Sequence, residues 1–204
     1  MKHLLIFIAI LFAASLTSFS SNANHSEDSP YTVIADAGER LFSRISKDQE
    51  SLKKFPDLMR DIVEEELMPS IDYKYAAFKV LGKNLTKMTK DQREKFILSM
   101  RGYLVRTYAI ALKQYKNQKV TFESIKPTNG ARIIGVETII SDINAPEINI
   151  TFQMRQNKKT QKWKAYDMII EGISLLSTKQ AEISKRIKKN GIDQVTLELA
   201  SFNK

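Results

Sequence analysis

The 204-residue sequence contains no cysteine and only two histidines, His3 and His25. Without cysteine the chain can form no disulfide bond, no thiolate metal site and no cysteine nucleophile. Both histidines lie near the N-terminus, so the body of the chain lacks the side chain that most often acts as a general base or zinc ligand. These absences argue against serine–histidine hydrolysis, cysteine chemistry and the common zinc sites.

The sequence also lacks a glycine-rich phosphate loop and a GxGxxG motif. Gly172-Ile173-Ser174 has no flanking glycines of a nucleophile elbow, and no histidine is present nearby to activate Ser174. Asp167 and Glu171 could form an acid–base pair, but they more simply orient a turn between a strand and a helix. We therefore predict a non-enzymatic protein without a cofactor, with a carboxylate-dependent hydrolase as a remote alternative.

The N-terminal 23 residues have the pattern of a secretory signal. Lys2 and His3 precede an almost wholly apolar run, residues 4–16, and Ser21-Asn22-Ala23 offers small residues for cleavage. The apolar run is shorter than the roughly 20 residues that a membrane span needs. We predict that residues 1–23 are a cleaved signal peptide and that residues 24–204 form a single secreted domain.

The sequence has a formal net charge of +9, and removing a leader that contains Lys2 lowers it to +8. A basic secreted protein could contact anionic lipid headgroups, acidic protein surfaces or nucleic acid. Arg101-Gly102-Tyr103 and Arg106-Thr107-Tyr108 place basic residues beside aromatic ones, as nucleic-acid platforms do. These tyrosines, however, fall on an apolar helical stripe, and a secreted location also argues against nucleic acid. We predict no nucleic-acid partner.

Helical patterns dominate residues 31–116. Apolar residues recur at helical spacing in 31–45 and 55–67, and Ser70 or Asp72 can cap a shorter helix that runs through Leu81. Thr89 and Gln92 fit a capping box that opens the longest predicted helix, 90–116. Its apolar stripe suits a helix that lies across a sheet; the stripe consists of Phe96, Met100, Leu104, Tyr108 and Leu112.

From residue 120 the apolar period changes to two. The segments 120–126, 132–141, 147–156 and 163–170 alternate in this way, separated by turn sequences and a polar loop. We predict an α+β fold with N-terminal helices, a four-stranded antiparallel meander sheet, and C-terminal helices on the apolar face of the sheet.

The segment from Trp163 to Gly191 joins the last predicted strand to a basic helix. Strict alternation places Tyr166, Met168 and Ile170 on one face of that strand. Ser177 fits the N-cap of the helix, and Asn190-Gly191 fits its end. Because the chain must turn from strand to helix within about six residues, we predict a positive φ at Gly172.

Several of these strings resemble those of one known family. Tyr166-Asp167-Met168-Ile169-Ile170-Glu171-Gly172-Ile173-Ser174, followed by Thr178-Lys179-Gln180 and Gly191-Ile192-Asp193, is similar to the MlaC (toluene-tolerance) family of periplasmic phospholipid-binding proteins. Upstream, Pro69-Ser70-Ile71-Asp72-Tyr73, Val80-Leu81-Gly82 and Gln92-Arg93-x-x-Phe96 resemble the same family in the same order. Leu85 departs from the pattern, because many relatives are expected to carry an aromatic residue there.

The resemblance implies a deep apolar cavity between sheet and helices that takes phospholipid acyl chains and leaves the headgroup at the mouth. It also implies a function: a soluble periplasmic carrier that shuttles phospholipid between an outer-membrane lipoprotein–porin complex and an inner-membrane MCE-ring ABC transporter. The phospholipid would be cargo. Because each buried CH₂ group contributes ~0.8 kcal/mol, two acyl chains could be held tightly.

The lining of such a cavity is predicted from the inward parity of the strands and from the stripe of the long helix. The predicted lipid-binding residues are Phe96, Leu104, Tyr108, Phe122, Val136, Ile148, Ile150, Phe152, Met154, Tyr166, Met168 and Ile170. From composition alone, the same interface could be filled or hollow, and a filled core is the default for a domain of this size. The alternative function is therefore a secreted, non-enzymatic adaptor that binds another protein through its basic surface.

Overall fold

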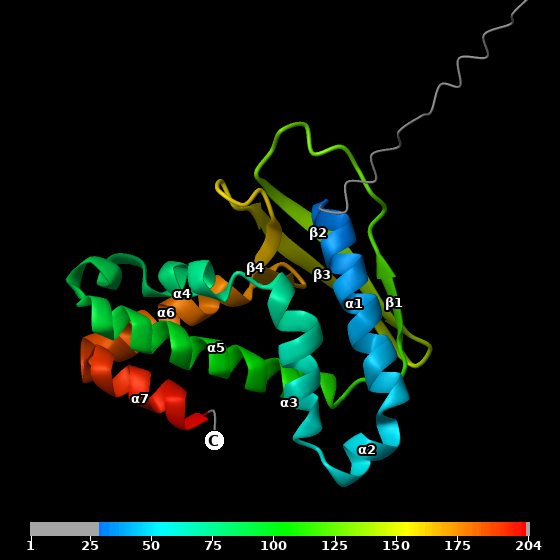
Figure 1. Ribbon diagram of the computed structural model, residues 1–204, viewed down its shortest axis with the longest axis horizontal. Helices are drawn as coiled ribbons and strands as arrows, with labels where there is room; N and C mark the ends of the chain where they lie inside the picture. The colour runs from blue at the N-terminus through cyan, green and yellow to red at the C-terminus, as the bar shows by residue number, and fades with distance from the viewer. Residues whose placement is uncertain (1–28, 203–204) are drawn as a thin grey trace, which may run out of the picture.

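The computed structural model describes residues 29–202, so the predicted signal peptide lies outside the described residues. A sheet with helix α1 across it forms one part of the molecule, and helices α4 to α7 form a helical layer beside it (Figure 1). The helices are α1 (Pro30–Lys47), α2 (Gln49–Lys54), α3 (Leu58–Ile62), α4 (Tyr73–Leu81), α5 (Lys90–Leu112), α6 (Leu175–Asn190) and α7 (Ile192–Phe202). This arrangement confirms the predicted α+β class.

The predicted helix over residues 55–67 is not one regular α-helix. It begins as α3 and continues as a π-helical turn, η1 (Val63–Leu67), and a 3-10 turn, η2 (Met68–Ser70). Pro69 cannot donate a backbone hydrogen bond, which favours the end of a helix at this point. Within η1, Glu64 forms a two-pronged ion pair with Arg101 of α5, which ties this turn to the long helix.

Two predicted helix starts are confirmed. Asp72 caps α4, because its Oδ1 accepts a hydrogen bond of 3.1 Å from the backbone of Tyr75. Thr89 and Gln92 form the capping box of α5, with reciprocal hydrogen bonds of 3.1 Å. A further 3-10 segment, η3 (Gly82–Lys87), connects these helices. Helix α5 ends at Leu112, four residues before the predicted boundary, and its end leads toward the first strand.

The sheet is antiparallel with the strand order β1-β2-β3-β4-β5. The strands are β1 (Lys119–Phe122), β2 (Ile133–Asp142), β3 (Ala145–Gln156), β4 (Trp163–Ile170) and β5 (Ile173–Ser174). The prediction of four strands is therefore wrong. Glu171 and Gly172 have φ values of 47° and 79°, and two consecutive positive φ values make the tight hairpin turn that folds Ile173 and Ser174 back onto β4.

A bulge in β4 corrects the predicted faces of that strand. Phe152 pairs with Met168, and Met154 pairs with Ala165, so Tyr166 is the extra residue in the ladder. Directly paired residues share a face of the sheet, which places Ala165 on the same face as Met154 and Met168. Strict alternation predicted that Tyr166 lies on the same face of the strand as Met168. The alternation breaks at the bulge, because an inserted residue reverses the parity of the residues beyond it.

The start of α6 also differs from the prediction. Ser174, not Ser177, is the N-cap: its hydroxyl accepts a hydrogen bond of 2.9 Å from the backbone of Ser177. Asp167 supports this start, because its carboxylate accepts from the Ser174 hydroxyl at 2.7 Å and from the backbone of Leu176 at 2.9 Å. Asp167 therefore orients the turn between strand and helix, as the sequence indicated.

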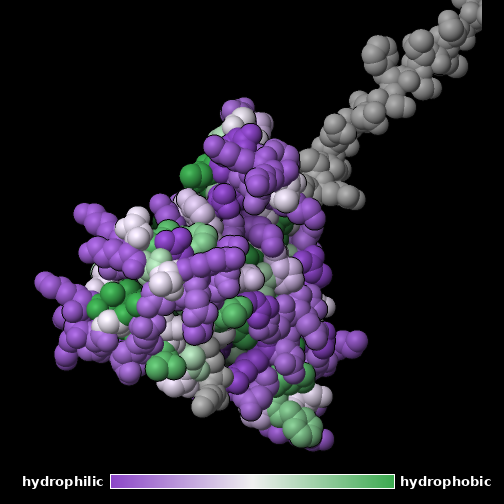
Figure 2. All heavy atoms as spheres, turned by 60° about the vertical axis from the view of Figure 1, so that its left-hand side comes forward, coloured by the Kyte–Doolittle hydropathy of each residue, from purple (hydrophilic) through white to green (hydrophobic). Residues whose placement is uncertain are grey.

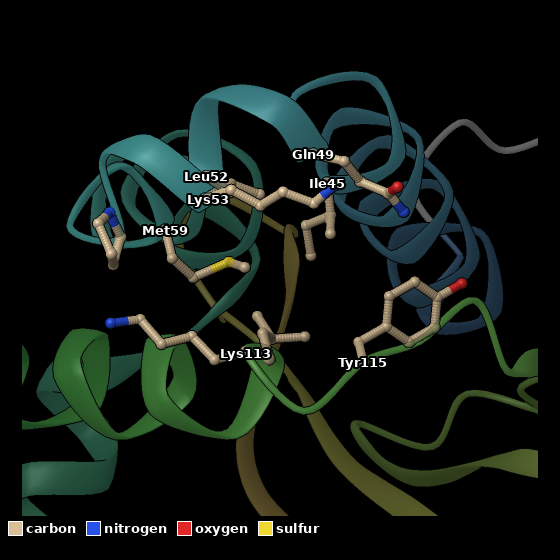
Figure 3. A pocket seen from close by; sticks show the side chains of 9 residues that line it. Ile45, Gln49, Leu52, Lys53, Met59, Lys113 and Tyr115 are labelled. Carbon is tan, nitrogen blue, oxygen red and sulfur yellow. The ribbon is translucent and has the colours of Figure 1, made fainter.

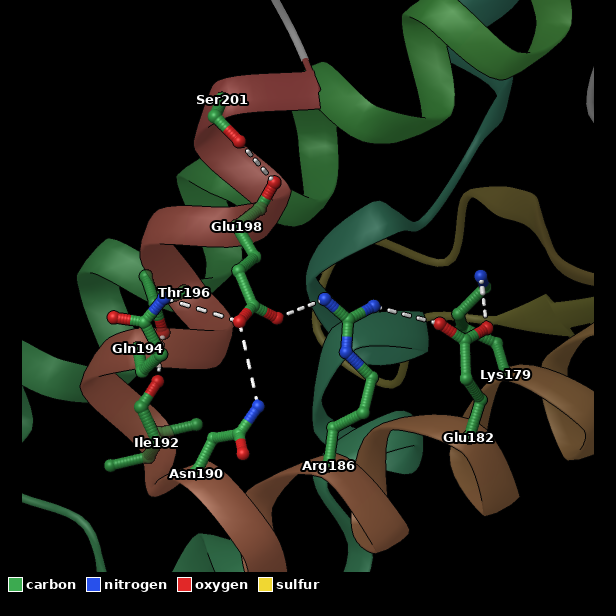
Figure 4. Close-up of polar contacts among 9 residues, drawn as sticks. All are labelled: Lys179, Glu182, Arg186, Asn190, Ile192, Gln194, Thr196, Glu198 and Ser201. Carbon is green, nitrogen blue, oxygen red and sulfur yellow. Dashed lines mark hydrogen bonds and ion pairs between the residues drawn. The ribbon is translucent and has the colours of Figure 1, made fainter.

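Helices α6 and α7 are joined by a polar network (Figure 4). Glu182 receives a hydrogen bond of 2.6 Å from Lys179 and one of 2.9 Å from Arg186, which also pairs with Glu198 of α7. Gly191 separates the two helices with a φ of 78°. The network fixes α7 against the helical layer, whose outer surface is mostly hydrophilic with scattered apolar patches (Figure 2).

The buried side chains form two clusters. The first lies between the sheet and the helices α1, α3 and the C-terminal half of α5; it includes Val105, Val136 and Met154. The second lies within the helical layer and includes Phe96 and Ile183. Helix α5 contributes to both clusters, because its N-terminal half packs in the second and its C-terminal half in the first. It therefore spans the boundary between them.

Candidate functional site

The last turns of α5 carry one continuous apolar stripe toward the sheet. Leu104, Tyr108 and Leu112 follow one another at four-residue spacing and so lie on one side of the helix. Tyr115 continues the row just after the helix ends. At 1.5 Å per residue the stripe is roughly 16 Å long. One end of the stripe lines a wide hollow, and the other end lines a small inner cavity.

The hollow is about 310 Å³ in volume. It opens between the end of α1, helices α2 and α3, and the C-terminal end of α5, and strands of the sheet are visible behind it (Figure 3). Most of its wall is apolar: Ile45, Leu52, Pro56, Met59 and Leu112. Its volume lies at the lower end of the ~300–1,000 Å³ range of small-molecule sites.

Four polar side chains also line the hollow. Tyr115 donates a hydrogen bond of 3.3 Å to the carbonyl of Gln118, and burial raises the pKa of its hydroxyl. Gln49 donates to Asn117 at 3.4 Å. Lys53 pairs with Glu50 at 2.6 Å on the exposed surface of α2. Lys113 has no ion-pair partner among residues 29–202, so its charge faces the hollow uncompensated.

The inner cavity is about 30 Å³, which is the space of roughly one water molecule. It lies where α5 and α4 meet β3 and β4; its wall consists of Ile71, Ala76, Leu104, Tyr108, Phe152, Ala165, Tyr166, Asp167 and Met168. Burial, together with the nearby charge of Asp167, raises the pKa of Tyr108 to about 12. The ring of Tyr166 stands edge-on to that of Tyr75, with centroids 5.1 Å apart.

The inner face of the sheet extends beyond its helical cover. Along β3, Met154 is completely buried, Phe152 and Ile150 are half-buried, and Ile148 is 43% exposed. Ile148 pairs with Ile140 of β2, and Ile150 pairs with Ile170 of β4. The partly exposed apolar surface therefore extends from β3 onto both neighbouring strands. We call the set Ile140, Ile148, Ile150, Ile170 and Ile173 the open strip. It is apolar sheet surface that no described helix covers fully.

The structure distributes the predicted lipid-binding residues over several environments. Leu104, Tyr108, Phe152, Tyr166 and Met168 meet around the inner cavity. Ile148, Ile150 and Ile170 lie on the open strip, and Phe122, Val136 and Met154 belong to the cluster between sheet and helices. Phe96 lies apart from these residues, fully buried in the helical layer. Whether any of them contacts lipid stays a prediction.

None of the predicted residues lines the hollow, which sequence reasoning missed. Ile45, Leu52 and Met59 come from three successive helices, α1, α2 and α3, whose relative placement depends on the breaks at Asp48 and Pro56. The available signals were the predicted apolar helical patterns, since Leu112 belongs to the α5 stripe and Ile45 and Met59 fall in the patterns over 31–45 and 55–67. Within residues 29–202 no acidic or histidine cluster could hold a metal ion, and no helix is long and apolar enough to cross a membrane.

Comparisons with known proteins agree on one family. The family described as MlaC protein matches residues 35–201. The chain is 32% identical to the intermembrane phospholipid transport system binding protein MlaC of Haemophilus influenzae, over 96% of this chain and 89% of that protein. It is 22% identical to a toluene tolerance protein of Pseudomonas putida, over 80% of this chain and 75% of that protein.

A solved structure has the same fold. A phospholipid-binding protein from Ralstonia solanacearum, determined in complex with a phospholipid, aligns with a TM-score of 0.75 at 20% identity, over 85% of this chain and 96% of that chain. The sequence match covers most of the chain. The protein belongs to the MlaC family.

Proposed function

We propose that this protein is a soluble periplasmic phospholipid carrier that moves lipid between outer-membrane and inner-membrane components of a lipid-asymmetry transport system. This role requires no covalent chemistry. The protein would bind the acyl chains, shield them from water and release them to a partner. The proposed partners are an inner-membrane MCE-ring ABC transporter and an outer-membrane lipoprotein–porin complex.

The observation that carries the proposal is the apolar stripe of α5 between the hollow and the inner cavity. Leu104 and Tyr108 line the inner cavity, and Leu112 lines the hollow. One helix face therefore leads from a wide opening toward a buried space under the sheet. An acyl chain that follows this face would exchange water for apolar side chains along most of its length, at a gain of ~0.8 kcal/mol per CH₂ group.

Lipid uptake would require the sheet and α5 to separate. The inner cavity holds about one water molecule, which is far less than an acyl chain needs. Such a movement would open part of the first buried cluster, which lies between the sheet and the C-terminal half of α5, while the second cluster keeps its own packing. A bound lipid would then hold the two parts apart, and its slow release would call for a partner.

Extraction of the purified protein tests the proposal. The protein, expressed with its leader and purified from the periplasm, is extracted with organic solvent and the extract is analysed by mass spectrometry. The proposal predicts phospholipid at a fixed molar ratio to protein. A protein-binding adaptor with a filled core would yield none, and the small inner cavity makes this the relevant alternative. Absence of phospholipid, also after incubation with vesicles, would refute the carrier function.

A further inference from the structure

The two apolar openings of the molecule differ in the charge around them. The lining of the hollow includes Lys53 and Lys113 and no carboxylate. The strand ends beside the open strip carry charges of both signs: Asp142, Glu147 and Glu171, and also Lys119, which pairs with Ser141. The uniformly basic charge in the lining therefore favours an anionic group at the hollow.

Lys53 and Lys113 approach the hollow from opposite walls. Lys53 comes from α2, and Lys113 directly follows the last residue of α5. Figure 3 shows these side chains on opposite sides of the hollow, with Met59 between them. An apolar floor under two ammonium groups has the shape and polarity of a site for an anionic amphiphile. Its chain would contact the floor, and its acidic group would lie between the lysines.

Both ammonium groups are available to a ligand. Lys113 has no ion-pair partner among the described residues, 29–202. Lys53 pairs with Glu50, but their side chains are 70% and 79% exposed, and such surface pairs contribute little to stability. A phosphate could therefore bind Lys53 together with Glu50, or in place of Glu50, without breaking a buried contact.

We infer that the hollow is a headgroup site that selects anionic phospholipids over zwitterionic ones. This inference rests on the proposed carrier function and adds to it the class of headgroup. A zwitterionic headgroup brings its own ammonium group close to Lys53 and Lys113, which offsets the attraction of its phosphate. An anionic headgroup such as phosphoglycerol brings no such cation.

The test measures which lipid the protein takes from a defined mixture. The full-length chain, processed in the periplasm and stripped of lipid, is incubated with vesicles of equal phosphatidylglycerol and phosphatidylethanolamine content, re-isolated, and extracted for mass spectrometry. We expect phosphatidylglycerol to be enriched about fivefold over its share of the vesicles, since each exposed charge pair contributes modestly.

The substitution Lys53→Gln with Lys113→Gln should bring the ratio close to that of the vesicles while total bound lipid stays within about twofold of the original. The control Lys158→Gln with Lys162→Gln removes the same charge from the loop between β3 and β4 and should keep the enrichment. A wild-type ratio equal to that of the vesicles, or enrichment that survives the double substitution, would overturn the headgroup inference alone. Failure to bind any phospholipid would instead overturn the carrier function on which it rests.

Discussion

The guanidinium of Arg155 on β3 forms an ion pair with the carboxylate of Asp72, the residue that caps α4. The Arg155 guanidinium also lies 4.1 Å from the centroid of the Tyr75 ring. The backbone of Asp72 donates a hydrogen bond of 2.7 Å to the carbonyl of Ala165 on β4. These contacts join the helical layer to the sheet beside the inner cavity.

Substitutions at Asp72 should separate its two roles. Asp72→Asn keeps a good N-cap but loses the charge, and we expect it to lower the free energy of unfolding by about 1 kcal/mol. Asp72→Ala loses both the cap and the ion pair and should cost about 2–3 kcal/mol. Urea unfolding followed by circular dichroism measures both. Equal costs for the two variants would show that the cap adds nothing beyond the Arg155 pair, and an Asp72→Asn variant as stable as the wild type would show that the ion pair adds nothing.

Gly172 should be sensitive to side chains that disfavour positive φ. Its φ is 79°, and an added Cβ would meet no atom within 4 Å, so the cost of substitution comes from the backbone. Gly172→Val should destabilise the protein by about 1–3 kcal/mol. It should also reduce the amount of bound lipid by a larger fraction than it reduces the helix content. Gly172→Asn, which tolerates this conformation, should cost less. Similar thermal unfolding of both variants and wild type would contradict the strained-turn explanation.

Tyr108 should make the protein less stable in alkali. Its pKa is raised from 10.0 to about 12 in the folded protein, so the folded state holds this proton more tightly than the unfolded state. The resulting stabilisation is fully present below pH 10 and is lost as the pH rises toward 12. By pH 11 the loss should be about 1.4 kcal/mol. Urea unfolding at pH 8 and pH 11 should show this loss in the wild type and a smaller one in Tyr108→Phe.

Ile150→Trp tests the open strip as part of the lipid path. Ile150 is half-buried on the inner face, opposite Ile170 and Thr138. A larger side chain there should occupy space meant for an acyl chain and reduce the co-purified lipid. Thr151→Trp, one residue along on the outer face, is the matched control and should retain it. Undiminished lipid in a folded Ile150→Trp variant would place the acyl chains elsewhere.

The basic surface should make lipid transfer depend on salt. With a formal charge of +9 over the whole sequence, the protein should be attracted to anionic acceptor vesicles. At physiological ionic strength such attractions are screened over ~8 Å. Transfer of a fluorescent phospholipid to anionic vesicles should slow as salt rises, whereas transfer to zwitterionic vesicles should change little. A rate independent of salt would leave the excess charge without a role in transfer.

The sequence by itself determined the features that depend on neighbours along the chain. The capping box of Thr89 and Gln92 and the positive φ at Gly172 were predicted, and Asp72 was one of the two caps predicted for α4; the structure has each of them. These features depend on hydrogen bonds or dihedral angles within a few residues. The family was predicted for a related reason, because its characteristic strings mark these local turns and helix starts.

Only the tertiary structure decided how distant segments meet. The bulge at Tyr166 reversed the parity of β4, and the short strand β5 moved the helix cap from Ser177 to Ser174. The hollow brings Ile45, Met59 and Leu112 together from three helices whose packing no local pattern specifies. Periodicity identifies the apolar face of each element, but the space left between two such faces depends on how their side chains fit together.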